Sequence, residues 1–270
     1  MTAPEQQVQQ VPDILAKIVA HKHVQLEQAR GYRPVVEQMA HMAKNDHRDF
    51  KAALMVNPPS VIAEVKKGSP SKGIFTHDFD PVAIGLSYEA GGAAALSVLT
   101  DSEFFYGSLQ DLERARTAVN IPVLRKDFTI DEHQVYEAAS VGADAILLIA
   151  AILTVEQMRK FRELAESLGL SALVEVHNDE ELRATIDSGA TIIGVNNRDL
   201  HTFKVSLDTS LRLAEKMPSN AVLVSESGIH SNADVKRLMD AGYKAFLVGE
   251  HLMTSGDATA ALRALRTLPA

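Results

Sequence analysis

A regular recurrence of short apolar segments is the feature that most constrains the fold of this chain. From Val61 onward eight such segments follow one another, each rich in residues that favour β-strands. Each but the last precedes a stretch with helical periodicity that ends in a turn of small residues. The first and last segments begin 184 residues apart, which gives about 26 residues for each of the seven intervals. The segments begin at Val61, Ala94, Val123, Ala145, Ala172, Ile192, Ala221 and Ala245.

Strands that alternate with helices build a parallel sheet, because a helix carries the chain back to the start of the next parallel strand. Eight units of this length suit closure into a barrel, which takes around 250 residues. An open, doubly wound sheet is the alternative, but no GxGxxG motif follows the first strand, as a dinucleotide-binding fold would require. We therefore predict an α/β fold, a (β/α)8 TIM barrel, for this chain of 270 residues.

The part of the chain before the first strand differs in character. Residues 1–56 are rich in Gln, His and Lys, and their apolar residues recur at helical spacing, as at Ile14, Ile18 and Val35. This pattern predicts two or three amphipathic helices. We expect residues 1–56 to form an N-terminal helical extension packed on the barrel, and residues 57–270 to form the barrel as a single domain.

The composition excludes several classes of partner. Acidic residues outnumber basic ones, 35 against 27, and a net charge of -8 repels nucleic acids and anionic membranes at long range. Without cysteine the chain has no disulfide, thiolate nucleophile or cysteine metal site, which fits a reducing compartment. No apolar run approaches the roughly 20 residues that span a bilayer, and the first residues do not resemble a signal peptide. We expect a cytoplasmic protein with no nucleic acid or membrane partner.

Polar side chains stand at the ends of several predicted strands. In a barrel of this type the active site lies at the carboxyl ends of the strands. The alternation of side chains along a strand places six such residues toward one cavity. They are Glu64 and Lys66 on the first strand, Lys126 on the third, Glu175 on the fifth, Asn196 on the sixth and Glu226 on the seventh.

Any one of these residues would also suit an ordinary salt bridge at a strand end. Six together point to a site, because charged side chains are almost never buried without a partner. Neighbouring charges shift one another's pKa values, which is what general acid and base catalysis needs. Arg198, just beyond the sixth strand, is a further candidate for substrate binding.

The loops after the first, seventh and eighth strands carry small residues, in GSPSKG, SESGI and LVGE. Backbone N–H groups after the last two strands of such barrels often hold a phosphate. Each glycine alone would suit a tight turn, and each serine a helix cap. Together they predict a phosphate site formed by Ser69, Ser227, Gly228 and Gly249.

These motifs, in this order and spacing, closely resemble those of indole-3-glycerol phosphate synthases, the ring-closing enzymes of tryptophan biosynthesis. The matching stretches run from about Asp13 to the C-terminus: IAEVKKGSPSKG, FFYGS, VLRKDF, LVEVH, GVNNRDL, SESGI and FLVGEHLM. The most specific is the signature E-V-K-x-x-S-P-S-x-G, intact from Glu64 to Gly73. The resemblance implies a (β/α)8 barrel, the single catalytic domain, with a helical extension over its mouth.

The resemblance also implies a reaction. The substrate would be 1-(2-carboxyphenylamino)-1-deoxyribulose 5-phosphate, which condenses on itself with loss of CO2 and water and needs no cofactor and no metal. The aryl carbon that bears the carboxylate must attack the C2 carbonyl of the ribulose part. An acid must protonate or polarise that carbonyl oxygen for the attack to proceed.

Residue roles follow by matching this sequence to the family motifs. Lys126 would be the general acid. Lys66 would hold the departing carboxylate and supply a proton during dehydration, with Glu64 orienting it. Glu175 would act as base or acid in the loss of the C2 hydroxyl. The match leaves open how the two lysines divide the acid work.

The other matched residues would bind the substrate. Asn196 and Glu226 would hold sugar hydroxyls, and Phe105 and Leu147 would face the anthranilate ring. Basic residues near this end of the barrel would draw in the phosphorylated substrate despite the net charge. They are Lys66, Lys67, Lys72, Lys126 and Arg198.

Two other functions fit parts of the pattern. Lys126 could form a Schiff base with a ketose phosphate, as in a barrel aldolase. The chain could instead be a non-catalytic subunit that docks a partner through its helical extension. Apolar helix stripes do not reveal the oligomeric state, since they also serve internal packing; we expect a monomer or a weak homo-oligomer.

Overall fold

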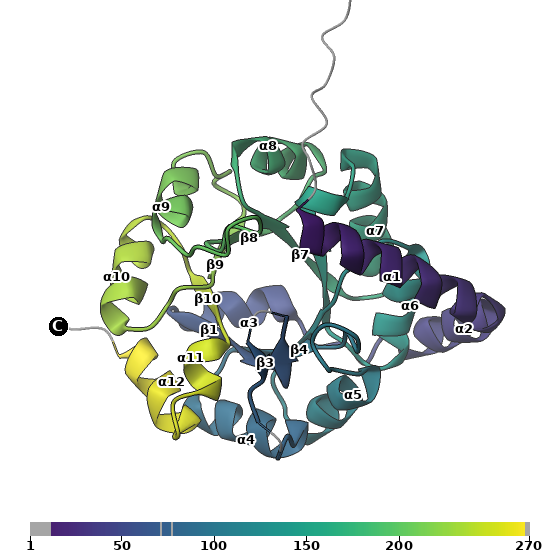
Figure 1. Ribbon diagram of the computed structural model, residues 1–270, viewed down its shortest axis with the longest axis horizontal. Helices are drawn as coiled ribbons and strands as arrows, with labels where there is room; N and C mark the ends of the chain where they lie inside the picture. Colours follow the sequence, from purple (N-terminus) through teal and green to yellow (C-terminus); the bar gives the residue numbers. More distant parts are fainter. Residues whose placement is uncertain (1–11, 71, 77, 268–270) are drawn as a thin grey trace, which may run out of the picture.

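The computed structural model describes residues 12–70, 72–76 and 78–267, and it shows a closed barrel of eight parallel strands (Figure 1). Strands consecutive in the barrel are hydrogen-bonded neighbours, and the last pairs with the first. The predicted TIM barrel is thus confirmed, while residues 1–11 of the predicted extension lie outside the described residues. The strands are β1 (Ser60–Val65), β4 (Ala95–Leu99), β5 (Val123–Lys126), β6 (Ala145–Ile149), β7 (Ser171–Val176), β8 (Ile192–Asn196), β9 (Val222–Glu226) and β10 (Ala245–Val248).

The helices between the strands form a ring around the barrel (Figure 1). Most begin at an Asp, Asn, Ser or Thr whose side chain accepts a hydrogen bond from the first turn, which is the preferred N-cap chemistry. None of the described helices has both the length and the apolar character needed to cross a bilayer. They are α4 (Pro81–Gly91), α5 (Leu109–Ala118), α6 (Glu132–Ser140), α7 (Val155–Ser167), α8 (Asp179–Asp187), α9 (Asp208–Ala214), α10 (Asn232–Asp240) and α12 (Ala258–Arg266).

Several short elements interrupt the regular pattern. The strands β2 (Gly68–Ser69) and β3 (Gly73–Ile74) form a small antiparallel hairpin after β1. A short helix α11 (Glu250–Met253) follows β10, and a 3-10 turn η2 (Ala150–Ile152) follows β6. The sequence analysis did not predict them, because two to four residues are too few to show a period.

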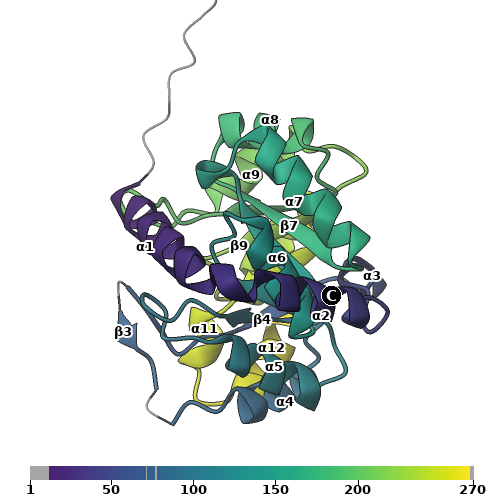
Figure 2. The same ribbon diagram turned by 90° about the vertical axis from the view of Figure 1, so that its right-hand side faces the viewer.

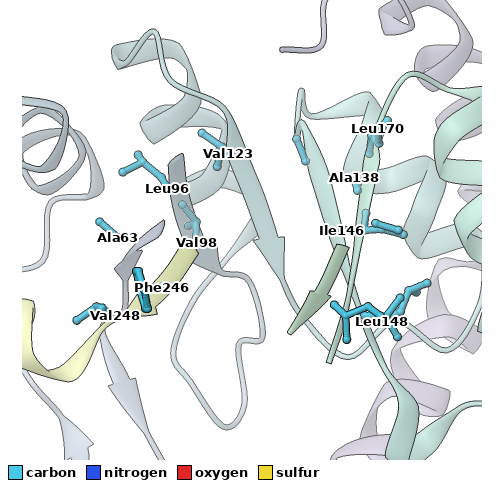
Figure 3. Packing of buried hydrophobic residues seen from close by; sticks show 14 of the residues in the cluster. Ala63, Leu96, Val98, Val123, Ala138, Ile146, Leu148, Leu170, Phe246 and Val248 are labelled. Atoms are coloured by element: carbon cyan, nitrogen blue, oxygen red, sulfur yellow. The ribbon is translucent and has the colours of Figure 1, made fainter. Parts of the chain in front are cut away.

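The barrel strands bury side chains on both faces. Outward residues such as Ala63, Leu96 and Ile146 pack against the helices, and Figure 3 shows part of this layer. Inward residues form a second apolar cluster inside the barrel, which includes Leu124 and Leu173. The inward direction predicted for alternate strand residues is therefore confirmed for the apolar positions below the charged strand ends.

The N-terminal extension contains the helices α1 (Asp13–Ala29), α2 (Arg33–Ala43) and α3 (Phe50–Val56), with a 3-10 turn η1 (Arg30–Tyr32). Figure 2 shows α1 and α3 at opposite ends of the barrel. Phe50 and Leu54 of α3 are fully buried against the inward cluster. The helix α3 therefore contributes to the barrel's own core, and α1 covers the opposite end. The division of the chain at residue 56 stays a prediction.

A buried ion cluster fastens α1 to the barrel. Lys22 of α1 is only 3% exposed, and its Nζ lies 2.9 Å from Asp101 and 2.7 Å from Asp127, which follow β4 and β5. Arg125 contacts the second oxygen of Asp127 at 3.0 Å. Burial would raise the pKa of Asp127, but Arg125 and Lys22 hold that pKa at about 2.

We expect Lys22→Met to lower the free energy of unfolding by about 3–5 kcal/mol, because it leaves the buried carboxylate of Asp101 without its cation. Urea denaturation at neutral pH measures the loss. The matched control is Lys17→Met on the exposed face of α1, which should change stability by less than about 0.5 kcal/mol. Equal losses in the two variants would contradict the anchoring role.

Candidate active site

The carboxyl ends of the strands open into a cavity of about 390 Å³. Strand ends, the β2–β3 hairpin, α1 and the loops after β8, β9 and β10 all contribute to its walls. All thirteen residues that the sequence proposed for the site lie in this lining, although their roles stay predictions. They are Glu64, Lys66, Ser69, Phe105, Lys126, Leu147, Glu175, Asn196, Arg198, Glu226, Ser227, Gly228 and Gly249.

A lysine between two glutamates lies at the floor of the cavity. The Nζ atom of Lys126, at the end of β5, donates to Oε2 of Glu175 on β7 at 2.9 Å and lies 3.3 Å from Oε2 of Glu226 on β9. Both carboxylates are buried. The barrel brings these residues together because each ends an inward-facing row of its strand.

Mutual charges set the protonation states of this cluster. Burial alone would lower the pKa of Lys126, but Glu175, Glu226 and Glu64 outweigh it and raise that pKa. Burial would raise the pKa of Glu175, yet Lys126 and His177 hold it well below its usual range. Burial raises the pKa of Glu226 to about 8, against the charge of Lys126 and with the help of the nearby Glu175. At neutral pH the cluster thus contains a cationic lysine, an ionised Glu175 and a protonated Glu226.

The second lysine of the site, Lys66, is the residue directly after β1. Lys66 Nζ lies 2.6 Å from Oε1 of Glu64, and it also lies 5.5 Å from the ring centroid of Phe75. Gly249 permits this arrangement, because a Cβ atom there would collide with the Glu64 carboxylate. The structure therefore places Glu64 beside Lys66, as an orienting role requires.

The side-chain amide of Asn196, at the end of β8, makes two hydrogen bonds in the cavity wall. Nδ2 of Asn196 donates to Oε1 of Glu175 at 3.3 Å, and Oδ1 accepts from the backbone N–H of Arg198 at 3.0 Å. Gly194, two residues earlier, leaves the space that the Glu226 carboxylate fills, since a Cβ there would overlap it. Asn196 thus links the charged floor to the Arg198 loop.

The predicted phosphate residues all line the cavity. Ser227 has a φ of 66° and the next residue, Gly228, has a φ of 76°, so two consecutive residues have left-handed backbones. Such a conformation is uncommon for a non-glycine residue and tends to occur at functional sites. Ser69 comes from the β2–β3 hairpin, which the chain places on the same cavity.

The charge balance of the mouth differs from the basic mouth that we expected. Glu250 on α11, which the sequence analysis gave no role, accepts a hydrogen bond from Lys72 and lies 3.7 Å from Arg198. Carboxylates accompany these cations, so the cavity lining as a whole has no excess of basic residues. The lining has four basic residues (Lys66, Lys72, Lys126, Arg198) and five acidic ones (Glu64, Asp127, Glu175, Glu226, Glu250).

An apolar wall faces the charged floor. The rings of Phe105 and Phe128 lie 5.8 Å apart with an interplanar angle of 34°. Leu147 of β6 also lines the cavity, as do Ile14 and Ile18 of α1. The helical spacing of the last two residues indicated a buried face, but not that this face covers the cavity.

His177 is a residue of this region whose contacts the sequence did not reveal. Its ring lies between Glu175 and Glu181. Among the described residues, no group of three or more histidine, aspartate or glutamate side chains is arranged to hold a metal ion.

Solved structures with similar folds have low sequence identity to this chain. The chain matches 3-hexulose-6-phosphate synthase with a TM-score of 0.62 and 14% identity, covering 77% of this chain and 98% of that one. It matches the tryptophan synthase α-subunit (E103A mutant) of Pyrococcus furiosus with a TM-score of 0.59 and 16% identity, covering 78% and 99%. At this identity the likeness supports the barrel fold alone.

Sequence relatives are far closer. The chain is 51% identical over 247 residues to the indole-3-glycerol phosphate synthase of Chloroherpeton thalassium, covering 89% of this chain and 95% of that protein. It is 48% identical over 258 residues to the enzyme of the same name from Chromobacterium violaceum, covering 94% and 97%. Residues 15–265 also match the family model described as indole-3-glycerol phosphate synthase. The chain therefore belongs to the indole-3-glycerol phosphate synthase family.

Proposed function

We propose that this cavity carries out the family's carboxy-lyase reaction by lysine and glutamate proton transfer. The substrate is 1-(2-carboxyphenylamino)-1-deoxyribulose 5-phosphate, the product is indole-3-glycerol phosphate, and the reaction belongs to tryptophan biosynthesis. One observation carries the assignment of mechanism: Lys126 is kept protonated on the floor of the cavity by its buried neighbours, above all by the ionised carboxylate of Glu175, 2.9 Å from its Nζ atom. A group in that state is suited to give a proton to a carbonyl oxygen.

The reaction consists of three changes in bonding. The aryl carbon that bears the carboxylate forms a bond to C2 of the sugar, and the C2 carbonyl oxygen takes a proton from Lys126. The bond between the aryl carbon and the carboxylate then breaks, CO2 leaves, and its bonding electrons restore the aromatic ring. Finally C2 loses its hydroxyl group as water, C1 loses a proton, and the C1–C2 double bond of the indole forms.

We infer complementary parts for the other charged residues. Lys66, held by Glu64 at 2.6 Å, binds the carboxylate that leaves and supplies a proton to the departing hydroxyl. Glu175, which stays ionised, takes the proton from C1. The short contact between Lys126 and Glu175 supports a proton exchange between these two residues during the cycle.

Three parts of the substrate then contact different residues of the cavity wall. Phe105 and Leu147 face the anthranilate ring, and Asn196 and Glu226 hold the sugar hydroxyls. Arg198 and the backbone around the predicted phosphate residues hold the other end of the molecule. Because the lining has no excess of basic residues, the phosphate must compete with Glu250 for Arg198 and Lys72.

A Schiff-base aldolase is less consistent with the same observations. A nucleophilic lysine must be neutral, and barrel enzymes of that kind lower its pKa. Here the carboxylates raise the pKa of Lys126 instead. Borohydride trapping with a ketose phosphate discriminates the two mechanisms, because only a Schiff base gives an irreversible adduct on Lys126.

We also propose a cytoplasmic location, a small phosphorylated substrate as the partner, and a monomer or weak homo-oligomer. The absence of cysteine and the acidic net charge support the location and argue against nucleic acid or membrane partners. Sedimentation of the purified protein tests the oligomeric state.

We expect Lys126→Ala to reduce turnover by about 10²- to 10⁴-fold, because it removes the general acid. Indole fluorescence after addition of the carboxyphenylamino deoxyribulose phosphate follows the reaction, and circular dichroism verifies that the variant is folded. The matched control is Lys244→Ala, an exposed lysine just before β10, which should leave turnover unchanged. A folded wild-type protein without any signal would overturn the proposed function.

The proton on Glu226 predicts a pH dependence of stability. In the unfolded chain Glu226 loses its proton near pH 4.5, whereas in the folded protein it keeps that proton until about pH 8. Its contribution to folding stability is therefore fully present below about pH 4.5 and is lost as the pH rises to about 8. We expect Glu226→Gln, which stays neutral, to gain up to a few kcal/mol over the wild type across this window.

Urea denaturation at pH 5 and at pH 8.5 measures this difference, which should be small at the lower pH and larger at the higher one. The control variant is Glu113→Gln on the exposed face of α5. A gap between Glu226→Gln and the wild type that stays constant with pH would contradict the shifted proton.

A further inference from the structure

His177 is a histidine in the shell behind the catalytic floor. It follows the end of β7, and its side chain is 11% exposed. Its Nε2 lies 3.3 Å from Oε1 of Glu175, and its Nδ1 lies 2.9 Å from Oε2 of Glu181. Burial would lower the pKa of His177, but these two carboxylates raise it to about 10. The ring is therefore a cation between two anions at neutral pH.

Glu181, the partner of His177 on the side away from Glu175, is held in place by several hydrogen bonds. The Glu181 carboxylate accepts from the backbone N–H of His177 at 2.8 Å and from Nδ2 of Asn178 at 2.7 Å. Asn178 in turn caps α8, accepting the backbone N–H groups of Glu180 and Glu181. Glu181 is buried, so its position is fixed by the start of the helix. The helix start thereby fixes the ring of His177.

The two oxygens of Glu175 face different cations. Oε2 accepts from Lys126, while Oε1 faces the ring of His177 and the amide of Asn196. The contact from His177 is an ion pair without hydrogen-bond alignment, so Nε2 has no hydrogen-bond partner among the described residues although it lies 3.3 Å from this carboxylate. Contacts of this kind often tighten when substrate binds.

Among the described residues, His177 is not part of the main cavity lining. It lines a neighbouring cavity of about 240 Å³, together with Glu181, Asn196 and Arg198. A substrate in the main cavity therefore meets Glu175 and not the imidazole. Any effect of His177 on the reaction must pass through the carboxylate that it contacts.

We propose that His177, held by Glu181, is a positioning residue that keeps Glu175 ionised and aimed at the substrate during dehydration. This inference rests on the proposed function, in which Glu175 removes the proton from C1. The charged or titratable groups that face Glu175 are Lys126 from β5, Glu226 from β9 and His177 itself, and those that face His177 are Glu175 and Glu181. Without His177 the carboxylate keeps one cation instead of two, and its pKa rises.

His177→Gln tests the proposal, because glutamine retains a donor but carries no charge. We expect the acid limb of the kcat profile to move to higher pH by about one unit or more, since an adjacent charge shifts a carboxyl pKa by that amount. We expect kcat to fall about 10- to 100-fold through misplacement of Glu175, with a smaller change in KM. The matched control, His41→Gln on the exposed part of α2, should reproduce the wild-type profile.

A direct readout does not depend on activity. Nitrogen NMR of histidine-labelled wild-type protein should show the His177 ring protonated at pH 8, and in Glu181→Gln the ring should lose its proton at a lower pH. If His177→Gln does not fold, this titration decides the matter, and a neutral ring at pH 8 in the wild type overturns the proposal.

The inference and the proposed function fail in different ways. If the wild-type protein does not turn over the substrate, the proposed function is wrong. If the wild type is active and folded His177→Gln keeps both kcat and the acid limb, Glu175 still has its function but His177 does not position it.

Discussion

The alternation of side chains on eight parallel strands is the constraint on which the rest of this structure depends. Each strand sends one row of residues inward, and in β5, β7 and β9 an apolar residue directly precedes the charged end of that row. The charged residues that end β5, β7 and β9 therefore lie above an apolar layer that includes Leu124, Leu173 and Val224. The inner parts of these side chains face a low-dielectric core, so each charge is stable there only beside an opposite charge. The same burial that makes the cluster costly gives it the shifted pKa values that acid–base chemistry uses.

Much of this arrangement was predictable, because the constraint has a sequence period. Recurring apolar segments indicated eight strands, and the residue that ends each inward row indicated where the polar site lies. All thirteen candidate residues therefore line one cavity. Elements without a period were missed: the β2–β3 hairpin has two residues in each strand, and α11 has four residues. Both nevertheless contribute to the cavity.

Pairs of charges were the part that the sequence could not supply. Lys22 and Asp127 are far apart in the chain, and nothing local to either residue marks the other as its partner. The same holds for Lys72 and Glu250, whose pairing makes the count of basic residues a poor guide to the charge of the mouth. His177 and Glu181 are only four residues apart, but one follows a strand and the other is in a helix. Their contact depends on the turn between these elements.

The buried ion cluster of α1 connects the cover of the mouth with its chemistry. Asp127 is the residue after Lys126, so the cation of Lys22 that holds α1 in place also holds the side chain that follows the proposed general acid. Asp101, the other partner, accepts from the backbone N–H of Phe104 at 2.7 Å and thereby shapes the loop that carries Phe105. The helix, the acid and the aromatic wall thus share one set of contacts. A displacement of α1 would open the cavity and also loosen two of the groups that the substrate meets inside it, so the extension is part of the active site rather than an addition to a complete barrel.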